Sequence, residues 1–154
     1  MSKIVLITHQ KGGVGKSTLT FNLAQNISRN AKVAVLDFDL QGSLSQLKEL
    51  VTDFEIIPFK GEIDDILKLD QDFVFIDTPP YLSNHLPKLI AIADLVILPT
   101  KAGVLDLLAI KGTLELIEDE QKTADTLVVF NMIKANTTLT IDILIGLEEY
   151  NVKI

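Results

Sequence analysis

The chain has 154 residues, 47% of them apolar and 23% charged, which suits one compact domain with a buried core and excludes disordered, collagen-like and low-complexity proteins. Its 14 basic and 21 acidic residues give a net charge of −7, so a contact with nucleic acid or anionic lipid needs a local basic patch. The absence of cysteine excludes disulfides, thiolate metal sites, iron–sulfur clusters and cysteine nucleophiles. His9 and His85 are too far apart in the sequence to indicate a metal site, and neither is given a role.

Short apolar runs alternate with helix-like segments along the whole chain. The runs predict strands at residues 4–7, 33–36, 54–59, 73–76, 95–98 and 127–130, of which 54–59 is the weakest candidate. Helical spacing of apolar residues predicts helices at residues 17–29, 44–50, 63–69, 83–92, 105–120 and 139–150. Because the strands are apolar on both faces, we expect a three-layer α/β fold, a mostly parallel sheet with helices on both faces, in a single domain of residues 1–154.

No segment of the sequence is typical of a signal peptide or of a membrane span. The N-terminal residues lead directly into a polar, glycine-rich loop. The longest apolar stretch, residues 89–98, is interrupted by Asp94 and is shorter than the ~20 residues that cross a bilayer. We therefore expect a cytoplasmic protein. Residues 148–154 are mixed and short rather than a basic amphipathic helix, so we expect no binding to membranes.

The loop after the first predicted strand has the sequence of a phosphate-binding loop. Residues 11–18 read KGGVGKST and lie between a buried strand and an amphipathic helix. Glycines allow backbone N–H groups to converge on an anion, and the positive end of the helix adds to the attraction. Lys16 can then reach the outer phosphates of a nucleotide, and Ser17 can ligate Mg²⁺. The strict pattern has a glycine where this chain has Gln10, and Lys11 is an additional cation.

This loop resembles the deviant Walker A loop of the ParA/MinD family of P-loop ATPases, and most closely that of the small ParA-type partition ATPases. Residues 37–42, DFDLQG, are similar to the Asp-x-Asp-Pro-Gln-Gly that ends the second strand of the family, with Leu40 in place of proline. Residues 73–80, FVFIDTPP, resemble the third family motif. The resemblance continues at Pro99, at the helix start Leu105 and Asp106, and at Asn131. It implies a P-loop NTPase-like fold.

The resemblance implies roles for the matching residues. The residues expected to bind the phosphates are Gly12, Gly13, Val14, Gly15, Lys16, Ser17 and Thr18, and the residue expected to contact adenine is Asn131. The expected catalytic residues are Lys11, Lys16 and Asp39, and the residues expected to bind Mg²⁺ are Ser17, Asp37 and Asp77. Two switch segments that respond to the γ-phosphate would contain Gln41 and Gly42 in the first and Thr78, Pro79 and Pro80 in the second.

Lys11 is the diagnostic residue of this resemblance. In the family, the matching lysine reaches across a nucleotide-sandwich dimer to the phosphates of the other subunit, where a second cation stabilises the charge of the transition state. Asp39 would orient the attacking water, and Asp37, two residues earlier, points to the same face of the strand. A buried aspartate such as Asp77, at the end of an apolar strand, is costly unless a cation pairs with it.

The resemblance implies a switch that binds ATP or ADP with Mg²⁺, slowly hydrolyses ATP to ADP and phosphate, and forms an ATP-dependent homodimer. The expected role is plasmid or chromosome segregation, with a centromere-binding or activator protein as partner. Non-specific DNA is a further partner that the sequence leaves open, and binding it would place the protein on the nucleoid.

Departures from the family leave two alternatives open. Partition ATPases of this type continue into another strand and into helices with basic DNA-contacting residues, whereas this chain has Arg29 as its one arginine. The missing strand is expected to expose a sheet edge. The first alternative is an ATP-dependent protein-positioning scaffold that does not bind DNA. The second is a small-molecule ligase or kinase of the dethiobiotin-synthetase type, for which the sequence shows no substrate-site residues.

Overall fold

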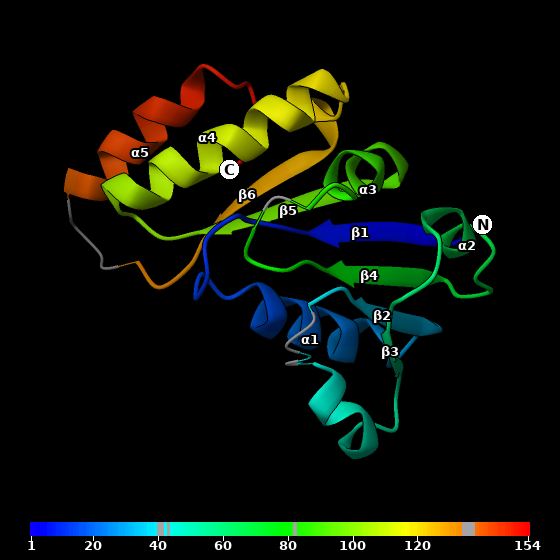
Figure 1. Ribbon diagram of the computed structural model, residues 1–154. Coiled ribbons are helices and arrows are strands. Elements are labelled where there is room, and N and C mark those ends of the chain that lie inside the picture. The colour runs from blue at the N-terminus through cyan, green and yellow to red at the C-terminus, as the bar shows by residue number, and fades with distance from the viewer. Residues whose placement is uncertain (40–41, 43, 82, 134–137) are drawn as a thin grey trace.

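The computed structural model describes residues 1–39, 42, 44–81, 83–133 and 138–154 (Figure 1). Its strands are β1 (Lys3–Ile7), β2 (Val33–Asp37), β3 (Glu55–Pro58), β4 (Phe73–Asp77), β5 (Leu95–Thr100) and β6 (Thr126–Phe130). Its α-helices are α1 (Lys16–Ile27), α2 (Ile63–Ile66), α3 (Leu86–Ile92), α4 (Val104–Asp119) and α5 (Thr138–Glu148). Two 3₁₀ helices are η1 (Ser45–Leu50) and η2 (Thr123–Asp125). Strands and helices alternate as the sequence predicts.

The strands form one six-stranded sheet in the order β3-β2-β4-β1-β5-β6, and each neighbouring pair is parallel. The carboxyl ends of the strands therefore meet at one edge of the sheet. The register places Asp77 of β4 beside both Ile7 of β1 and Asp37 of β2. The loop that follows β1 thus starts next to the aspartates that end β2 and β4.

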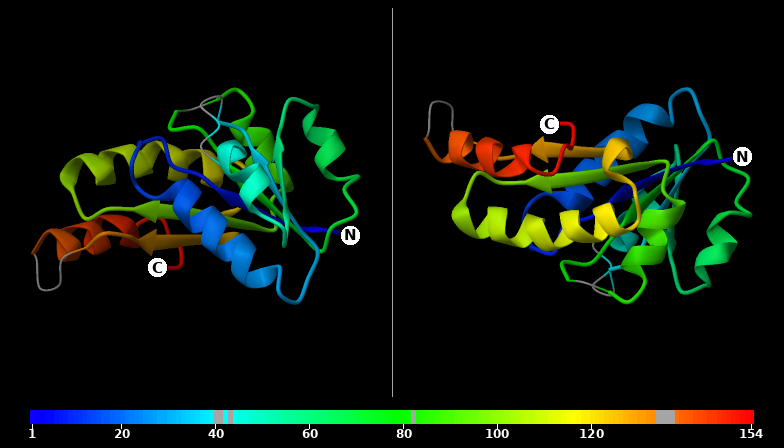
Figure 2. Two further views of the ribbon diagram at one scale, coloured as in Figure 1. Left: turned by 90° about the horizontal axis from the view of Figure 1, so that it is seen from below. Right: turned by 90° about the horizontal axis from the view of Figure 1, so that it is seen from above.

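Two apolar layers cover the sheet, because successive residues of a buried strand point to opposite faces. Ile4 and Leu6 of β1 belong to the core beneath α2, α3, α4 and α5, whereas Val5 and Ile7 belong to the core beneath α1 and η1. Figure 2 shows α1 on one side of the sheet and α2, α3 and α4 on the other. The expected three-layer α/β architecture with a parallel sheet is confirmed.

Three predicted helices differ in detail from the structure. The predicted helix over 44–50 is a 3₁₀ helix over Ser45–Leu50, and the predicted helix over 63–69 is reduced to the short α2. The predicted helix over 83–92 begins only at Leu86, with Pro87 in its first turn, where a proline costs no hydrogen bond. The weak strand candidate at 54–59 is confirmed as the edge strand β3, which ends at Pro58, a residue that sheets tolerate at an edge.

The opposite edge of the sheet is partly covered by the last residues of the chain. The N–H of Val128 in β6 donates to the carbonyl of Lys153 at 2.8 Å, and the two segments run parallel. The edge of β6 that the sequence predicts to be exposed is therefore paired with another segment at this bridge. Of the helices that the structure describes, none has both the length and the apolar character needed to cross a membrane.

Candidate nucleotide-binding site

The loop between β1 and α1 folds as a cradle of backbone N–H groups. Gly13 and Gly15 have φ angles of 69° and 100°, in the left-handed region that favours glycine. A Cβ atom on Gly15 would overlap the side-chain amide of Asn131, so this position also requires glycine for space. No side chain caps the first turn of α1, which leaves the positive end of this helix available to an anion.

Lys16 begins α1 and is 7% exposed. Its ammonium donates a hydrogen bond to the carbonyl oxygen of Lys11 at 3.3 Å, across the loop. Burial lowers the pKa of Lys16, and the charges of Asp77 and Asp39 act in the opposite direction. A buried ammonium at the base of the loop is an unfavourable arrangement that a bound phosphate would relieve.

Ser17 and Thr20, on successive turns of α1, both contact Asp77. Ser17 Oγ donates to Asp77 Oδ2 at 2.6 Å, and Thr20 Oγ1 lies 3.3 Å from Asp77 Oδ1. Asp77 is fully buried, and burial raises its pKa to about 6 despite the bond from Ser17, with the charge of Asp37 adding to the rise. A hydroxyl and a carboxylate are the hard oxygen ligands that Mg²⁺ prefers, so these residues fit a magnesium ion that is shared with phosphates.

Asp37 and Asp39 lie at the end of β2, on the far side of Asp77 from the loop. Asp37 is 3% exposed, and both of its carboxylate oxygens accept hydrogen bonds from Asp39 and Ser45. Asp39 is half-buried and close enough to Lys16 to influence its pKa. The structure therefore brings the two predicted aspartates to the same place but gives Asp37 protein partners.

Asn131 follows β6 and is held by two hydrogen bonds, one to the end of β5 and one to the glycine loop. Its backbone N–H donates to the carbonyl of Thr100 at 2.7 Å, and its Nδ2 donates to the carbonyl of Val14 at 2.9 Å. The side-chain oxygen is the group left to accept a hydrogen bond from a base amine. Asn131 thus lies beside the glycine loop, and its adenine contact stays a prediction.

The side chain of Lys11 pairs with Asp106 at the start of α4. Its ammonium is 2.8 Å from Asp106 Oδ1, and the two side chains are 36% and 7% exposed. Within the described residues, this oxygen of Asp106 has ionic contact but no hydrogen bond of good geometry. The backbone N–H of Lys11 donates to Nδ1 of His9 at 2.9 Å.

Four residues of the site were not assigned a role from the sequence: His9, Thr20, Ser45 and Asp106. His9 is fully buried, and burial followed by the charge of Lys16 lowers its pKa to about 4, so the ring is neutral and Nδ1 serves as the acceptor that holds the loop entrance. The position of His9 directly before the loop was the one signal in the sequence. Asp106 appeared only as part of a helix-start match.

The two predicted switch segments are described in part. Gly42 has a φ angle of 63°, while Leu40 and Gln41 lie outside the described residues. Thr78 Oγ1 donates to the carbonyl of Ile7 at 3.1 Å, which joins the second segment to the end of β1. Pro79 is buried and Pro80 is exposed beside Gly12.

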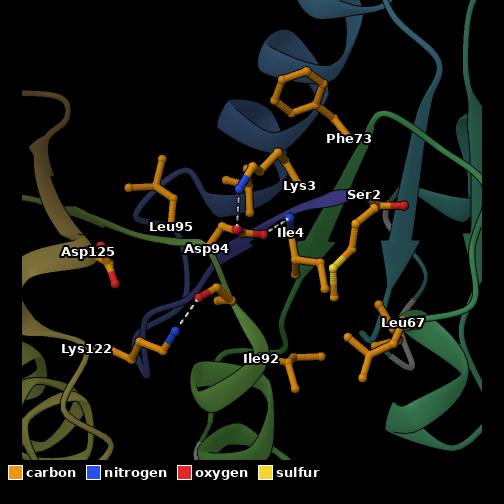
Figure 3. Close-up of a pocket in the computed structure, with 14 residues that line it drawn as sticks. Ser2, Lys3, Ile4, Leu67, Phe73, Ile92, Asp94, Leu95, Lys122 and Asp125 are labelled. Carbon is orange, nitrogen blue, oxygen red and sulfur yellow. Dashed lines mark hydrogen bonds and ion pairs between the residues drawn. The ribbon is translucent and has the colours of Figure 1, made fainter.

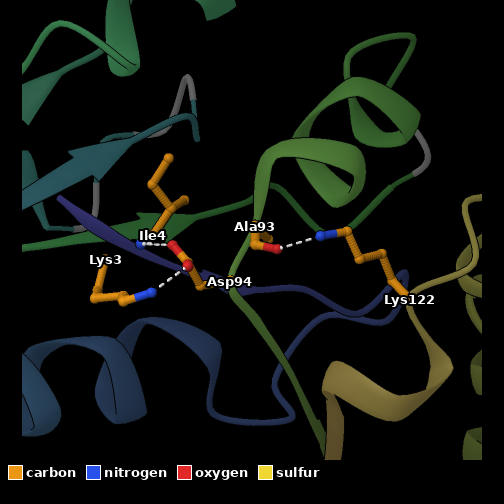
Figure 4. Close-up of polar contacts among 5 residues, drawn as sticks. All are labelled: Lys3, Ile4, Ala93, Asp94 and Lys122. Carbon is orange, nitrogen blue, oxygen red and sulfur yellow. Dashed lines mark hydrogen bonds and ion pairs between the residues drawn. The ribbon is translucent and has the colours of Figure 1, made fainter. Parts of the chain in front are cut away.

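A separate cavity of about 620 Å³ lies at the amino ends of the strands and contains none of these residues (Figure 3). Its polar groups bond to one another: Asp94 accepts from the Lys3 ammonium and the Ile4 N–H, and Lys122 donates to the carbonyl of Ala93, each at 2.8 Å (Figure 4). These bonds brace the starts of β1 and β5. The candidate site is therefore the carboxyl edge of the sheet.

Residues 5–154 match the family described as the CobQ/CobB/MinD/ParA nucleotide binding domain. A curated relative, maintenance of carboxysome distribution protein A of Halothiobacillus neapolitanus, is 30% identical over 148 residues, which cover 87% of this chain and 68% of that protein. The chain spans between 52% and 68% of the length of the first two curated relatives.

Two solved structures share the fold. A putative plasmid partition protein of Borrelia burgdorferi B31, bound to AMPPNP, has a TM-score of 0.76 and 23% identity, covering 96% of this chain and 83% of that one. The cobyrinic acid a,c-diamide synthase of Mycobacterium smegmatis, with bound ADP and magnesium, has a TM-score of 0.74 and 20% identity, covering 97% of this chain and 82% of that one.

Proposed function

This chain belongs to the family of CobQ/CobB/MinD/ParA nucleotide-binding domains, and we propose that it is a Mg²⁺-dependent ATP switch that dimerises around its nucleotide and positions a DNA or protein cargo in the cytoplasm. One observation carries the proposal: Lys16, Ser17 and Asp77 converge on the glycine loop. This combination provides a cation for the phosphates and oxygen ligands for a metal ion.

Each residue has a chemical task in the proposed reaction. The N–H groups of residues 12–18 and the Lys16 ammonium hold the phosphates, because the loop and the start of α1 point positive groups to one place. Ser17 and Asp77 would hold Mg²⁺, which when bound neutralises charge that develops on the phosphates. Asp39 orients the water that attacks the γ-phosphate. The expected products are ADP and phosphate.

Lys11 supplies the link between hydrolysis and dimerisation in this proposal. In the structure its ammonium contacts Asp106 of the same chain, a contact that lacks hydrogen-bond geometry. Such a contact is easily exchanged for phosphate oxygens, which accept stronger charge-assisted hydrogen bonds. Lys11 would leave Asp106 when two subunits close around ATP, and an activator protein would accelerate the step that follows.

The choice between a DNA cargo and a protein cargo depends on surface charge. The outer faces of α4 and α5 expose the carboxylates of Glu115, Glu118, Asp119, Asp142 and Glu148. Added to the net charge of −7, they oppose binding to DNA and favour a protein partner. The name of the carboxysome-distribution relative agrees with positioning of a protein cargo, which makes this the second candidate function.

The proposal is tested by calorimetry and light scattering on the whole chain. We expect ATP with Mg²⁺ to bind the wild-type chain and to stabilise a dimer of the Asp39→Ala variant, and we expect Lys11→Ala to bind ATP but to remain monomeric. A folded chain that takes up neither ATP nor ADP would refute the proposal. DNA binding at low and high salt, with ATP and with ADP, separates the two cargoes, and transfer of phosphate to a metabolite would instead indicate a small-molecule kinase.

A further inference from the structure

Asp37 is the centre of a hydrogen-bonded group that joins the end of β2 to the residues beyond it. Its Oδ2 accepts from the backbone N–H of Ser45 at 2.9 Å and from Ser45 Oγ at 2.7 Å. Its Oδ1 accepts from the backbone N–H of Asp39 at 3.1 Å. One buried carboxylate therefore fixes residues two and eight positions further along the chain.

The surroundings of Asp37 hold this group rigidly. The carbonyl of Asp37 accepts from the N–H of Phe59 at 3.0 Å, and the N–H of Phe38 donates to the carbonyl of Asp77 at 3.0 Å, so both neighbouring strands fix the end of β2. The N–H of Gly42 donates to the carbonyl of Asp39 at 2.8 Å. Asp39 is thus held through its N–H by Asp37 and through its carbonyl by Gly42.

We propose that Asp37 and Ser45 are positioning residues that form a clamp, and that this clamp sets the place of Asp39 relative to Lys16 and Asp77. The proposal rests on the proposed function, because Asp39 is the residue that would orient the attacking water. Three donors satisfy Asp37, and charge-assisted bonds of this kind are about twice as strong as neutral ones. Ser45 has no role in the family resemblance described above.

The clamp differs from the metal-binding role that the resemblance implies for Asp37. Oδ2 of Asp37 accepts two hydrogen bonds from Ser45 and Oδ1 accepts one from Asp39, whereas each oxygen of Asp77 accepts a single bond, so Asp37 has fewer lone pairs left for a metal ion. If Asp37 binds the metal, only Asp37 variants change the Mg²⁺ requirement. If Asp37 acts through Ser45, variants of either residue have the same effect, and the second substitution adds little to the first.

The first experiment measures hydrogen exchange of the backbone amides of Asp39 and Ser45 without nucleotide. We compare the wild-type chain, Asp37→Asn, Ser45→Ala, the double variant and Ser45→Thr. We expect exchange about tenfold faster in both single variants, no further increase in the double variant, and recovery with threonine, which restores the hydroxyl. Ser28→Ala is the matched control, because Ser28 Oγ donates to the helix carbonyl of Gln25 on an exposed surface, away from Asp37.

The second experiment measures ATP hydrolysis and its Mg²⁺ dependence in the same variants. We expect kcat to fall about tenfold in Asp37→Asn and in Ser45→Ala, with KM for ATP and the Mg²⁺ concentration at half-maximal rate unchanged. Unchanged exchange in Ser45→Ala, or a higher Mg²⁺ requirement in Asp37→Asn alone, would overturn the clamp. If the wild-type chain binds no nucleotide, the proposed function fails, while the exchange experiment still decides whether the clamp exists.

Discussion

A lysine–aspartate ion pair lies near each end of β1, and the two pairs have the same distance between their charged atoms but different exposure to water. At the amino end, Lys3 contacts Asp94 at 2.8 Å, and their side chains are 65% and 37% exposed (Figure 4). Beyond the carboxyl end, Lys11 contacts Asp106 at 2.8 Å, and the side chains of these two residues are 36% and 7% exposed. Asp94 also accepts a backbone hydrogen bond from Ile4, whereas the contacting oxygen of Asp106 is buried without a hydrogen bond among the described residues.

This difference indicates that the amino ends of the strands have a structural role and the carboxyl ends a functional one. The amino-end groups satisfy one another and are open to water, so each of them contributes little to stability and stays where it is. At the carboxyl end, Lys16 and Asp77 are buried with shifted pKa values, and one oxygen of Asp106 is buried without a hydrogen bond among the described residues. Such buried charges cost stability unless a ligand or another subunit pairs with them. Buried groups with perturbed pKa values are typical of functional sites.

The largest expected effect is on nucleotide binding by Lys16→Met. Methionine keeps the length of the side chain and removes its charge, so ATP affinity should fall at least ~100-fold, as expected when a buried cation–phosphate contact is lost. The folded chain should be no less stable, because burial already disfavours the Lys16 ammonium. Calorimetry measures the affinity and urea unfolding the stability. Lys3→Met is the control at the other end of β1, and equal loss of affinity in that variant would contradict the comparison.

The next effect concerns Asp77, whose pKa of about 6 lies above its ordinary value of 3.8. Because the folded chain holds this proton more tightly than the unfolded chain, Asp77 favours folding at low pH, and this advantage is lost as the pH rises through 6. Asp77→Asn should therefore be about 3 kcal/mol more stable than wild type at pH 7.5 and nearly equal to it near pH 4, since each pKa unit is worth about 1.4 kcal/mol.

Urea unfolding at several pH values, without metal or nucleotide, measures this difference. The variant should also lose the stabilisation by Mg²⁺ and ATP that we expect for the wild-type chain. The pKa of Asp94 is shifted in the opposite direction to that of Asp77: burial alone would raise it, but the hydrogen bonds from Lys3 and Ile4 lower it. Its contribution to stability is therefore present at neutral pH and lost as the pH falls. A destabilised Asp77→Asn chain at pH 7.5 would show that the carboxylate is not under strain.

The fold was predictable because its signals are local. Each buried strand is a short apolar run, and the loop of residues 11–18 marks the first turn from strand to helix, so order and layers followed from the sequence. The helix predicted over 44–50 is a 3₁₀ helix over Ser45–Leu50, and its apolar spacing does not reveal that Ser45 is bonded to Asp37.

The site was predictable only where residues belong to a contiguous motif. Lys16 and Ser17 belong to the glycine loop that follows the first strand, and Asp77 is the last residue of another predicted strand. Because the carboxyl ends of parallel strands lie together, the sequence predicts that these residues are close. Asp106 is far from Lys11 in the sequence, and its contact depends on how α4 packs against the loop. His9 resembles any core histidine until its bond to the N–H of Lys11 is known.

A smaller effect is expected from Lys11→Ala on the stability of the chain without nucleotide. The substitution leaves the carboxylate of Asp106 buried without its cation, and unfolding should become easier by about 1 to 2 kcal/mol. Adding Asp106→Asn should restore most of this loss, because position 106 then no longer holds a buried carboxylate without a cation. Urea unfolding of the four chains in a double-mutant cycle measures the coupling. Additive effects would mean that the contact between Lys11 and Asp106 does not hold the lysine in the free subunit.

The smallest effect is expected from Lys3→Ala, which removes the matching pair at the amino end. An exposed ion pair contributes about 0.2 to 1 kcal/mol, and Asp94 keeps its hydrogen bond from Ile4, so unfolding at neutral pH should change by less than ~1 kcal/mol. The difference should shrink further in 1 M salt, where the screening length is about 3 Å. Lys11→Ala should respond less to salt, because Asp106 is shielded from water. If both pairs weakened equally in salt, the burial of the carboxyl-edge pair would not distinguish it, and the contrast between the two ends of β1 would rest on hydrogen bonding alone.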